Sequence, residues 1–142
     1  MGKIASKKTV VDGIEFDSAL EAEYFEHMKE QPDVLHITLQ PSFTLIEPFY
    51  VTCGRCDSGK VTSTKTGNKV QCPTCSGTGK RKRKAMTYTA DFAIHYRDGT
   101  EEIVDVKGYA NERFNYIRKI FEWKYGQELI VVKKQKGEWV RK

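Results

Sequence analysis

Hydrophobic and polar residues alternate over residues 88–107, and this alternation predicts a β-hairpin. In the first strand every second residue is large and apolar, and the second strand, over 103–106, is almost entirely apolar. Asp91 lies at the start of the first strand, while Asp105 and Lys107 close the second. The hairpin therefore brings an acid of one strand toward an acid and a lysine of the other.

The register of the hairpin decides whether these acids share a face. A two-residue loop at positions 98–99 would place Asp91 opposite Val106 and leave the two acids on opposite faces. A three-residue loop at 97–99, with its glycine in the left-handed conformation, places Asp91 opposite Asp105, and the lysine follows on the same face. We expect the second register.

The pattern before this hairpin predicts a helix with one apolar face. Asp17 or Ser18 is a suitable N-cap, and the helix should run to about Lys29 because Pro32 prevents its continuation. Its apolar arc consists of Leu20, Tyr24, Phe25 and Met28. Glu21 falls inside this arc. It is either an edge residue that reaches solvent or a carboxylate aimed at the core, which would need a charge partner or a metal.

Further along, the chain reads as extended over 36–51, with interruptions at Pro41 and Pro48. It reads as helical over 111–125 and extended again over 128–132. The second helix has one core stripe, made of Phe114, Ile117, Ile120 and Phe121. Tyr116 and Trp123 lie seven residues apart on its other side. They form either an exposed aromatic patch for a partner or a surface covered by the C-terminal tail.

These elements predict an α/β fold with a core in the order αβββαβ and one insertion. The core of the fold comprises residues 1–51 and 85–142. The insertion comprises residues 52–84, and we expect it to be zinc-ribbon-like. Asp12-Gly13 predicts a turn in the lead segment. Gln40 precedes a proline at a bend, so its side chain either supports a neighbouring site or is a surface amide.

Composition agrees with a single globular core. The chain has 142 residues, of which 39% are hydrophobic and 30% charged, and this size suits one ordinary core. No apolar run approaches the roughly 20 residues that span a bilayer, and the N-terminal segment lacks the apolar centre of a signal peptide. We therefore expect a cytoplasmic protein without a membrane partner.

The insertion contains two C-x-x-C pairs separated by 15 residues. The four cysteines are Cys53, Cys56, Cys72 and Cys75. This spacing is typical of a closed, structural zinc site, and a loop with so few apolar residues needs such a cross-link to fold. Paired disulfides are the alternative, which the lack of a secretory signal disfavours. The second pair, CPTCSGTG, is similar to the zinc repeat of the Hsp40 co-chaperones, which we take as a knuckle geometry only.

Positive charge concentrates in the same insertion. Residues 52–84 contain nine basic residues and one acid, so their net charge is +8. The whole chain has a net charge of +5, so the remaining residues together carry −3. The residues that we expect to contact DNA phosphates are Arg55, Lys80, Arg81, Lys82, Arg83 and Lys84. The alternative for the run from Lys80 to Lys84 is a solvated charge run, which also resembles a nuclear localisation signal. An acidic body with a basic arm suits an acidic site that acts on a polyanion.

Four segments, in the order FDSALEAEYF, LQPSF, YTADF and VDVKG, together resemble the PD-(D/E)XK nuclease superfamily, specifically its phage resolvase-like members related to phage endonuclease I. The resemblance covers nearly the whole chain outside the insertion. It implies a restriction-endonuclease-like core and a metal-dependent endonuclease. The zinc insertion departs from the core pattern of that family.

The resemblance assigns roles to four residues, and the chemistry of a magnesium site adds the carbonyl of Val106. Glu21 is the acid of the first helix, Asp91 the metal-binding acid, and Asp105 and Lys107 the D-x-K half-motif, in which the family often has glutamate at the first position. Asp91, Asp105 and the carbonyl oxygen of Val106 would hold Mg²⁺ (or Mn²⁺), and Glu21 would complete the site or hold a second ion. Lys107 would orient the attacking water and offset charge in the transition state.

The expected activity is structure-selective cleavage of branched DNA, as in a Holliday junction resolvase involved in DNA recombination. Paired cuts by such an enzyme imply a homodimer, for which the aromatic patch of the second helix is one candidate surface. The alternatives are a sequence-specific or transposon-end nickase, and a zinc-dependent DNA-binding adaptor in which the acids form structural ion pairs with the lysine.

Overall fold

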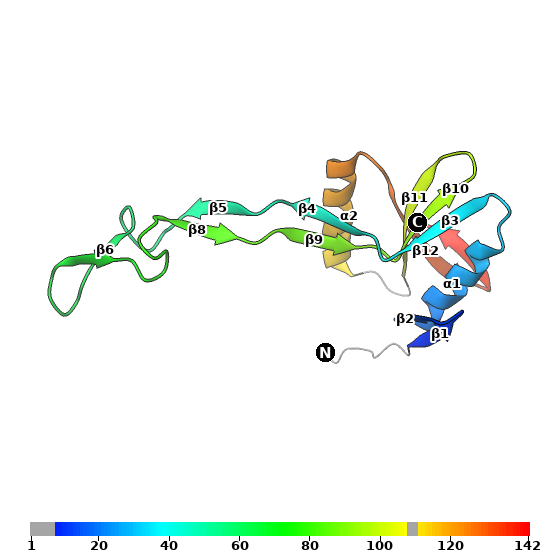
Figure 1. Cartoon of the computed structure of the whole chain (residues 1–142), viewed down its shortest axis with the longest axis horizontal. Coiled ribbons are helices and arrows are strands. Elements are labelled where there is room, and N and C mark those ends of the chain that lie inside the picture. The colour runs from blue at the N-terminus through cyan, green and yellow to red at the C-terminus, as the bar shows by residue number, and fades with distance from the viewer. Residues whose placement is uncertain (1–7, 108–110) are drawn as a thin grey trace. The chain divides into compact units, whose positions relative to one another are not determined.

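A computed structural model describes residues 8–107 and 111–142 as a mixed α/β protein, mostly sheet with two helices (Figure 1). The chain forms two compact units. The first comprises residues 1–43 and 88–142, and the second comprises residues 44–87. Each unit is described separately below.

The first unit contains β1 (Thr9–Val11), β2 (Ile14–Phe16), α1 (Ala19–Lys29), β3 (Val34–Leu39), β10 (Phe92–Tyr96), β11 (Glu101–Val106), α2 (Glu112–Tyr125), β12 (Leu129–Gln135) and β13 (Glu138–Arg141). The second contains β5 (Phe49–Thr52), β6 (Lys60–Thr62), β7 (Lys69–Gln71) and β8 (Lys80–Arg83). The paired strands β4 (Ser42–Ile46) and β9 (Met86–Thr89) cross the boundary between the units.

A five-stranded sheet in the order β13-β12-β11-β10-β3 forms the centre of the first unit. Strands β11 and β12 are parallel and are joined through α2, while the other neighbours are antiparallel. Both faces of the central strands are buried, which explains the nearly continuous apolar runs of β11 and β12. One face packs against α1 through a core that includes Phe92, Ile94, Val104, Val106, Ile130 and Val132.

Both predicted helices are confirmed, and Ser18 is the N-cap of the first. The side chain of Ser18 accepts a hydrogen bond from the N–H of Glu21 at the start of α1, as expected of an N-cap serine. In α2, Asn111 has the same role, and Gly126 ends the helix in the left-handed conformation at φ 63°. The apolar arc of α1 is buried, except that Leu20 is half-buried.

The hairpin of β10 and β11 has the register that we expected. Phe92 pairs with Val104, and the ladder continues to His95 opposite Glu101. The N–H of Tyr96 then donates to the carbonyl of Thr100 at 2.9 Å, and Gly99 has a φ of +89°. The three-residue loop is therefore confirmed, and its register places Asp91 opposite Asp105.

The extended segment predicted over 36–51, with a bend at Gln40-Pro41 and an interruption at Pro48, is confirmed, but it forms three strands where the predicted core order counts one. The segment is divided between β3, β4 and β5, with interruptions at Gln40 and at the Glu47-Pro48 pair. Gln40 has a φ of +49°, so the chain turns sharply there. Only β3 joins the central sheet, because β4 pairs with β9 instead.

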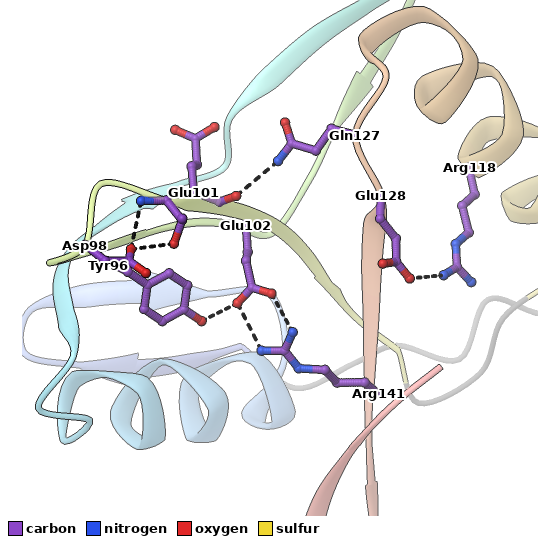
Figure 2. A network of polar contacts seen from close by, with 9 residues as sticks. Tyr96, Asp98, Glu101, Glu102, Arg118, Gln127, Glu128 and Arg141 are labelled. Carbon is purple, nitrogen blue, oxygen red and sulfur yellow. Dashed lines mark hydrogen bonds and ion pairs between the residues drawn. The ribbon is translucent and has the colours of Figure 1, made fainter.

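The C-terminal segment forms a strand and leaves Tyr116 and Trp123 of α2 exposed. Strand β12 extends to Gln135, beyond the predicted end at residue 132, and β13 returns along it. Arg141 of β13 binds Glu102 through two nitrogens, and the hydroxyl of Tyr96 donates to the same carboxylate (Figure 2). The hydrogen bonds from Arg141 and Tyr96 lower the pKa of Glu102 despite its partial burial. This charged cluster fixes β13 to β11.

Within the described ranges, neither helix is long and apolar enough to cross a membrane.

Candidate functional site

Asp105 is the most deeply buried charged residue of the first unit, with 3% of its surface exposed. It lies on β11 among apolar neighbours, where an unpaired carboxylate would be costly. The hydroxyl of Tyr88 donates to its Oδ2 atom, and the Nζ atom of Lys107 lies 3.2 Å from its Oδ1 atom. Lys107 also lies over the ring of Phe114, 4.4 Å from its centroid. Asp105 and Lys107 thus form an oriented, partly enclosed pair.

Asp91 lies in the break between β9 and β10, opposite Asp105. Its Oδ2 atom accepts a hydrogen bond of 2.8 Å from the N–H of Val106, and its carbonyl accepts one of 3.0 Å from the N–H of Gln40. The first contact fixes the carboxylate beside the D-x-K segment. The second joins the turn at Gln40 to the break between β9 and β10.

Glu21 and Asp91 are both held in surroundings that favour the neutral acid. Burial, the charge of Asp105 and a hydrogen bond with Asp105 raise the pKa of Asp91 to about 8, against a weaker opposing effect of the Val106 N–H. Burial, Asp17 and Asp105 raise the pKa of Glu21, while Ser18 and Lys107 act in the opposite direction. The cluster therefore holds more negative charge than Lys107 compensates.

A small pocket of about 140 Å³ opens beside these acids. Glu21, Gln40 and Asp91 line it together with apolar residues of β2, β3 and β10. The predicted support residue Gln40 therefore lines the same pocket as two of the predicted acids.

The donor set suits a hard divalent cation, because carboxylate and carbonyl oxygens are its preferred ligands. An added cation would also relieve the repulsion from Asp105 and Glu21 that, after burial, raises the pKa of Asp91. However, in the described ranges only the four cysteines form a group of three or more ligand residues whose donor atoms all lie within 4.8 Å of one another. The three acids are not gathered as tightly, so side-chain rotation would be needed to enclose an ion.

The second unit contains a separate candidate metal centre. The sulfur atoms of Cys53, Cys56, Cys72 and Cys75 all lie within 4.8 Å of one another, and none of these cysteines forms a disulfide. The Cys56 and Cys75 sulfurs are 3.7 Å apart, close to the roughly 3.8 Å that tetrahedral zinc with Zn–S bonds of 2.3 Å requires. The four cysteines can hold a structural metal ion such as zinc, as the spacing predicted.

The two cysteine knuckles support each other through a reciprocal pair of backbone contacts. The N–H of Cys53 donates to the carbonyl of Gly79, and the N–H of Cys72 donates to the carbonyl of Gly59, both at 2.8 Å. Burial opposes ionisation of Cys75, but the N–H groups of Gly79 and Gly77 and the thiol of Cys56 lower its pKa to about 6. The lowered pKa favours the thiolate form of Cys75, which is the form that binds metal.

The predicted DNA-contacting residues also lie in the second unit. Lys80 to Arg83 form β8, which pairs with β5, while Arg55 and Lys84 are exposed outside the strands. The structure therefore brings four of the six onto one strand, and no acid occurs on either strand of this ribbon.

Tyr88 is the residue of the carboxylate cluster that the sequence did not identify. It is 8% exposed, and its ring packs against Phe114 and Phe121 with centroids 6.4 and 6.3 Å away. The available signal was a tyrosine among apolar residues of a strand, since a buried hydroxyl needs a partner. The identity of that partner depends on the fold.

A family model with the description "Protein of unknown function (DUF1064)" matches residues 1–139. No curated protein and no solved structure matches the chain.

Proposed function

We propose that this chain, which belongs to the DUF1064 family, is a metal-dependent endodeoxyribonuclease with a PD-(D/E)XK type of site. The observation that carries the proposal is the arrangement of Asp91, Asp105 and Lys107 at the ends of two adjacent strands. The hairpin register places the two acids opposite each other, and the lysine lies 3.2 Å from Asp105. The sheet with α1 before β3 and α2 between the parallel strands β11 and β12 agrees with this interpretation.

In this proposal, Asp91, Asp105 and the Val106 carbonyl hold Mg²⁺ or Mn²⁺, and Glu21 completes the site. The cation would offset the negative charge that develops on the scissile phosphate and activate water near neutral pH. Tyr88 positions Asp105 through its hydrogen bond, and the Val106 N–H positions Asp91 in the same way.

Lys107 has the role of a fixed positive charge beside the phosphate. Its ammonium group is held between Asp105 and the ring of Phe114, so little reorganisation is needed when charge develops in the transition state. From this position it can donate a hydrogen bond to the attacking water or to a phosphate oxygen.

We propose branched DNA as the substrate and a homodimer as the active form. The support is the combination of the acid cluster with a separate basic unit, which suits binding of DNA over more than the scissile phosphate. The choice of a branched substrate rests on the resemblance to resolvase-like nucleases, which is an argument by analogy.

Cleavage of a labelled four-way junction tests this function, with linear duplex and single strand of the same sequence for comparison. We expect paired nicks at the junction in Mg²⁺ and none without added divalent metal. Omitting Mg²⁺ is preferable to adding a chelator, because a chelator would also remove zinc. Asp91→Ala and Lys107→Ala should abolish cleavage and retain DNA binding, while Lys65→Ala, in the second unit, should cleave as the unchanged protein does.

One observation favours a second candidate, a non-catalytic DNA-binding adaptor. The Lys107–Asp105 ion pair already gives a buried acid its partner without metal, and the three acids are not gathered within 4.8 Å. If the unchanged protein binds all three DNAs and cuts none in Mg²⁺ or Mn²⁺, the nuclease proposal is wrong and the adaptor replaces it.

A further inference from the structure

Strands β5 and β8 form a two-stranded ribbon with two different faces. The cross-strand pairs are Phe49 with Arg83, Tyr50 with Lys82, Val51 with Arg81, and Thr52 with Lys80. Because directly paired residues lie on the same side of a ladder and successive residues alternate, one face carries Tyr50, Thr52, Lys80 and Lys82. We call this set the tyrosine face; the other face carries Phe49, Val51, Arg81 and Arg83.

The tyrosine face is open to solvent. All four of its residues are exposed, and Tyr50 is 63% exposed. On the other face Phe49 and Arg83 are exposed, but Val51 and Arg81 are half-buried. Among the residues that the structure describes, neither lysine of this face has a carboxylate partner, and the Tyr50 hydroxyl has no hydrogen-bond partner. The ring and the two charges are therefore available to a ligand.

The position of the ring relative to the lysines is what distinguishes this face from an ordinary exposed tyrosine. Lys82 lies directly across the ladder from Tyr50, at the roughly 5 Å that separates such side chains, and Lys80 lies on the diagonal. A nucleotide offers a flat base and a phosphate a short distance apart. The ring can stack on the base while a lysine binds the phosphate.

Other partners fit this face less well. A membrane surface would require a wider apolar area than one ring beside a threonine. An acidic peptide would satisfy the lysines and leave the ring unused. In a duplex the bases are stacked on one another, so a ring cannot stack on them without unpairing, whereas unpaired bases offer their faces freely.

We infer that the tyrosine face of the β5–β8 ribbon binds unpaired nucleotides, with Tyr50 stacking on a base and Lys80 and Lys82 holding the adjoining phosphates. This inference rests on the proposed function in its choice of DNA over RNA, and it specifies what that function leaves open. The feature of branched DNA that the second unit recognises is the unpaired base at the branch.

The test measures binding to fluorescent oligo-thymidine and to a blunt duplex by anisotropy, without added Mg²⁺, on zinc-loaded full-length protein. Tyr50→Leu removes the ring from an exposed position, and Tyr50→Phe keeps it. We expect Tyr50→Leu to weaken binding to the single strand by about 5- to 150-fold, the value of one stacked base. Tyr50→Phe should bind as the unchanged protein does, and duplex binding should change little in either variant.

Charge is tested with Lys82→Gln and a matched control, Lys65→Gln, which removes an exposed lysine of the same unit outside the ribbon. Lys82→Gln should weaken single-strand binding and reduce its log–log salt slope by about 0.7, the value of one phosphate contact. Lys65→Gln should leave both quantities unchanged. Zinc content of each variant establishes that the unit is folded.

The inference is overturned if Tyr50→Leu binds oligo-thymidine as tightly as Tyr50→Phe, or if Lys65→Gln is as harmful as Lys82→Gln. Equal loss on duplex and single strand also overturns it in favour of groove binding, and so does Tyr50-dependent binding to anionic phospholipid vesicles in place of DNA. Because the binding test measures no cleavage, failure of the nuclease proposal can be distinguished from failure of the ribbon inference. If the protein shows these binding results but cuts no DNA, the ribbon inference stands and the nuclease proposal fails. If it cuts DNA but does not show them, only the ribbon inference fails.

Discussion

Asp91 is the residue at which stability and the proposed function conflict. Its carboxylate is held against Val106 N–H, yet burial and the neighbouring Asp105 raise its pKa to about 8. The usual value is 3.8, so the folded chain binds a proton that the unfolded chain has lost between about pH 4 and pH 8. Stability is therefore greatest below this window and falls as the pH rises through it.

Asp91→Asn should relieve this penalty in the absence of divalent metal. The amide oxygen can still accept from Val106 N–H, and no charge needs to be buried. We expect the melting temperature to rise by a few degrees at pH 8, at roughly 4 °C per kcal/mol, and by less at pH 5. Thermal unfolding at the two pH values measures this difference.

Asp98→Asn is the matched control for this prediction. Hydrogen bonds from the Thr100 side chain and backbone lower the pKa of Asp98, which is the opposite direction. Its substitution should give no pH-dependent rise in melting temperature. A gain at pH 8 in both variants, or in neither, would contradict the account of Asp91.

Tyr88 tests whether the buried hydrogen bond to Asp105 positions that acid for metal. Tyr88→Phe removes one donor to a buried carboxylate, which should destabilise the fold by about 1–3 kcal/mol. We also expect cleavage to require a higher Mg²⁺ concentration, because Asp105 is less firmly oriented. Urea unfolding and a Mg²⁺ titration of cleavage measure the two effects.

Tyr96→Phe is the corresponding control, since the Tyr96 hydroxyl also donates to a carboxylate, that of Glu102, outside the acid cluster (Figure 2). It should lower stability without a change in the Mg²⁺ requirement. If Tyr96→Phe and Tyr88→Phe shift that requirement equally, Tyr88 has only a structural role.

At the scale of elements, the cysteine knuckles depend on two turns whose glycines, Gly59 and Gly77, approach each other closely. A Cβ atom on Gly59 would lie 2.2 Å from the carbonyl oxygen of Gly77, and Gly59 has a φ of +91°. The buried apolar residues of this region are mainly the cysteines themselves, with Val61 packed against them. The metal centre and its glycines therefore replace an ordinary hydrophobic core.

Gly59→Ala should weaken zinc binding, because alanine would need the left-handed conformation and the Gly77 backbone would have to move. The conformational strain alone is about 1–2 kcal/mol, so we expect at least a roughly tenfold loss of zinc affinity in competition with a chromogenic chelator. Gly54→Ala is the control, since a Cβ at Gly54 meets nothing within 4 Å and needs no left-handed conformation. Equal zinc affinities of the two variants would contradict this account.

The hairpin of β10 and β11 shows why some elements were predictable in detail. Its register follows from a local property, the length of the loop with Gly99 in the left-handed conformation. The same holds for α1 and α2, whose caps and apolar stripes are encoded within a few residues. In contrast, the sequence did not predict β13, because its strand is defined by pairing with β12 and by the contact of Arg141 with Glu102.

At the scale of the whole molecule, α2 presents large aromatic side chains to solvent. Tyr116 is 60% exposed and Trp123 is 81% exposed, so within the described residues the C-terminal segment does not cover them. An exposed tryptophan is frequent at protein interfaces. We expect a second copy of the chain to bind there, because the proposed paired cuts in the two strands of a branch would require a dimer.

Trp123→Glu should convert the dimer to a monomer in sedimentation equilibrium, because burying an unpaired charge in an apolar interface is unfavourable. Paired nicks should then become single nicks. Leu35→Glu is the control, since Leu35 is a similarly exposed apolar residue on β3, at 62%. An unchanged mass for Trp123→Glu, or an equal change for Leu35→Glu, would place the interface elsewhere.

The sequence by itself determined the features that depend on neighbouring residues: both helices, the hairpin register, the cysteine spacing and the concentration of charge in one unit. Only the tertiary structure decided the pairing of the basic strand β8 with β5, the hydrogen bond from Tyr88 to Asp105 and the presence of Gln40 in the pocket beside Asp91. The physical reason is that each of these contacts joins residues far apart along the chain. Their proximity follows from the packing of the sheet and from strand pairing, which periodicity within a segment does not specify.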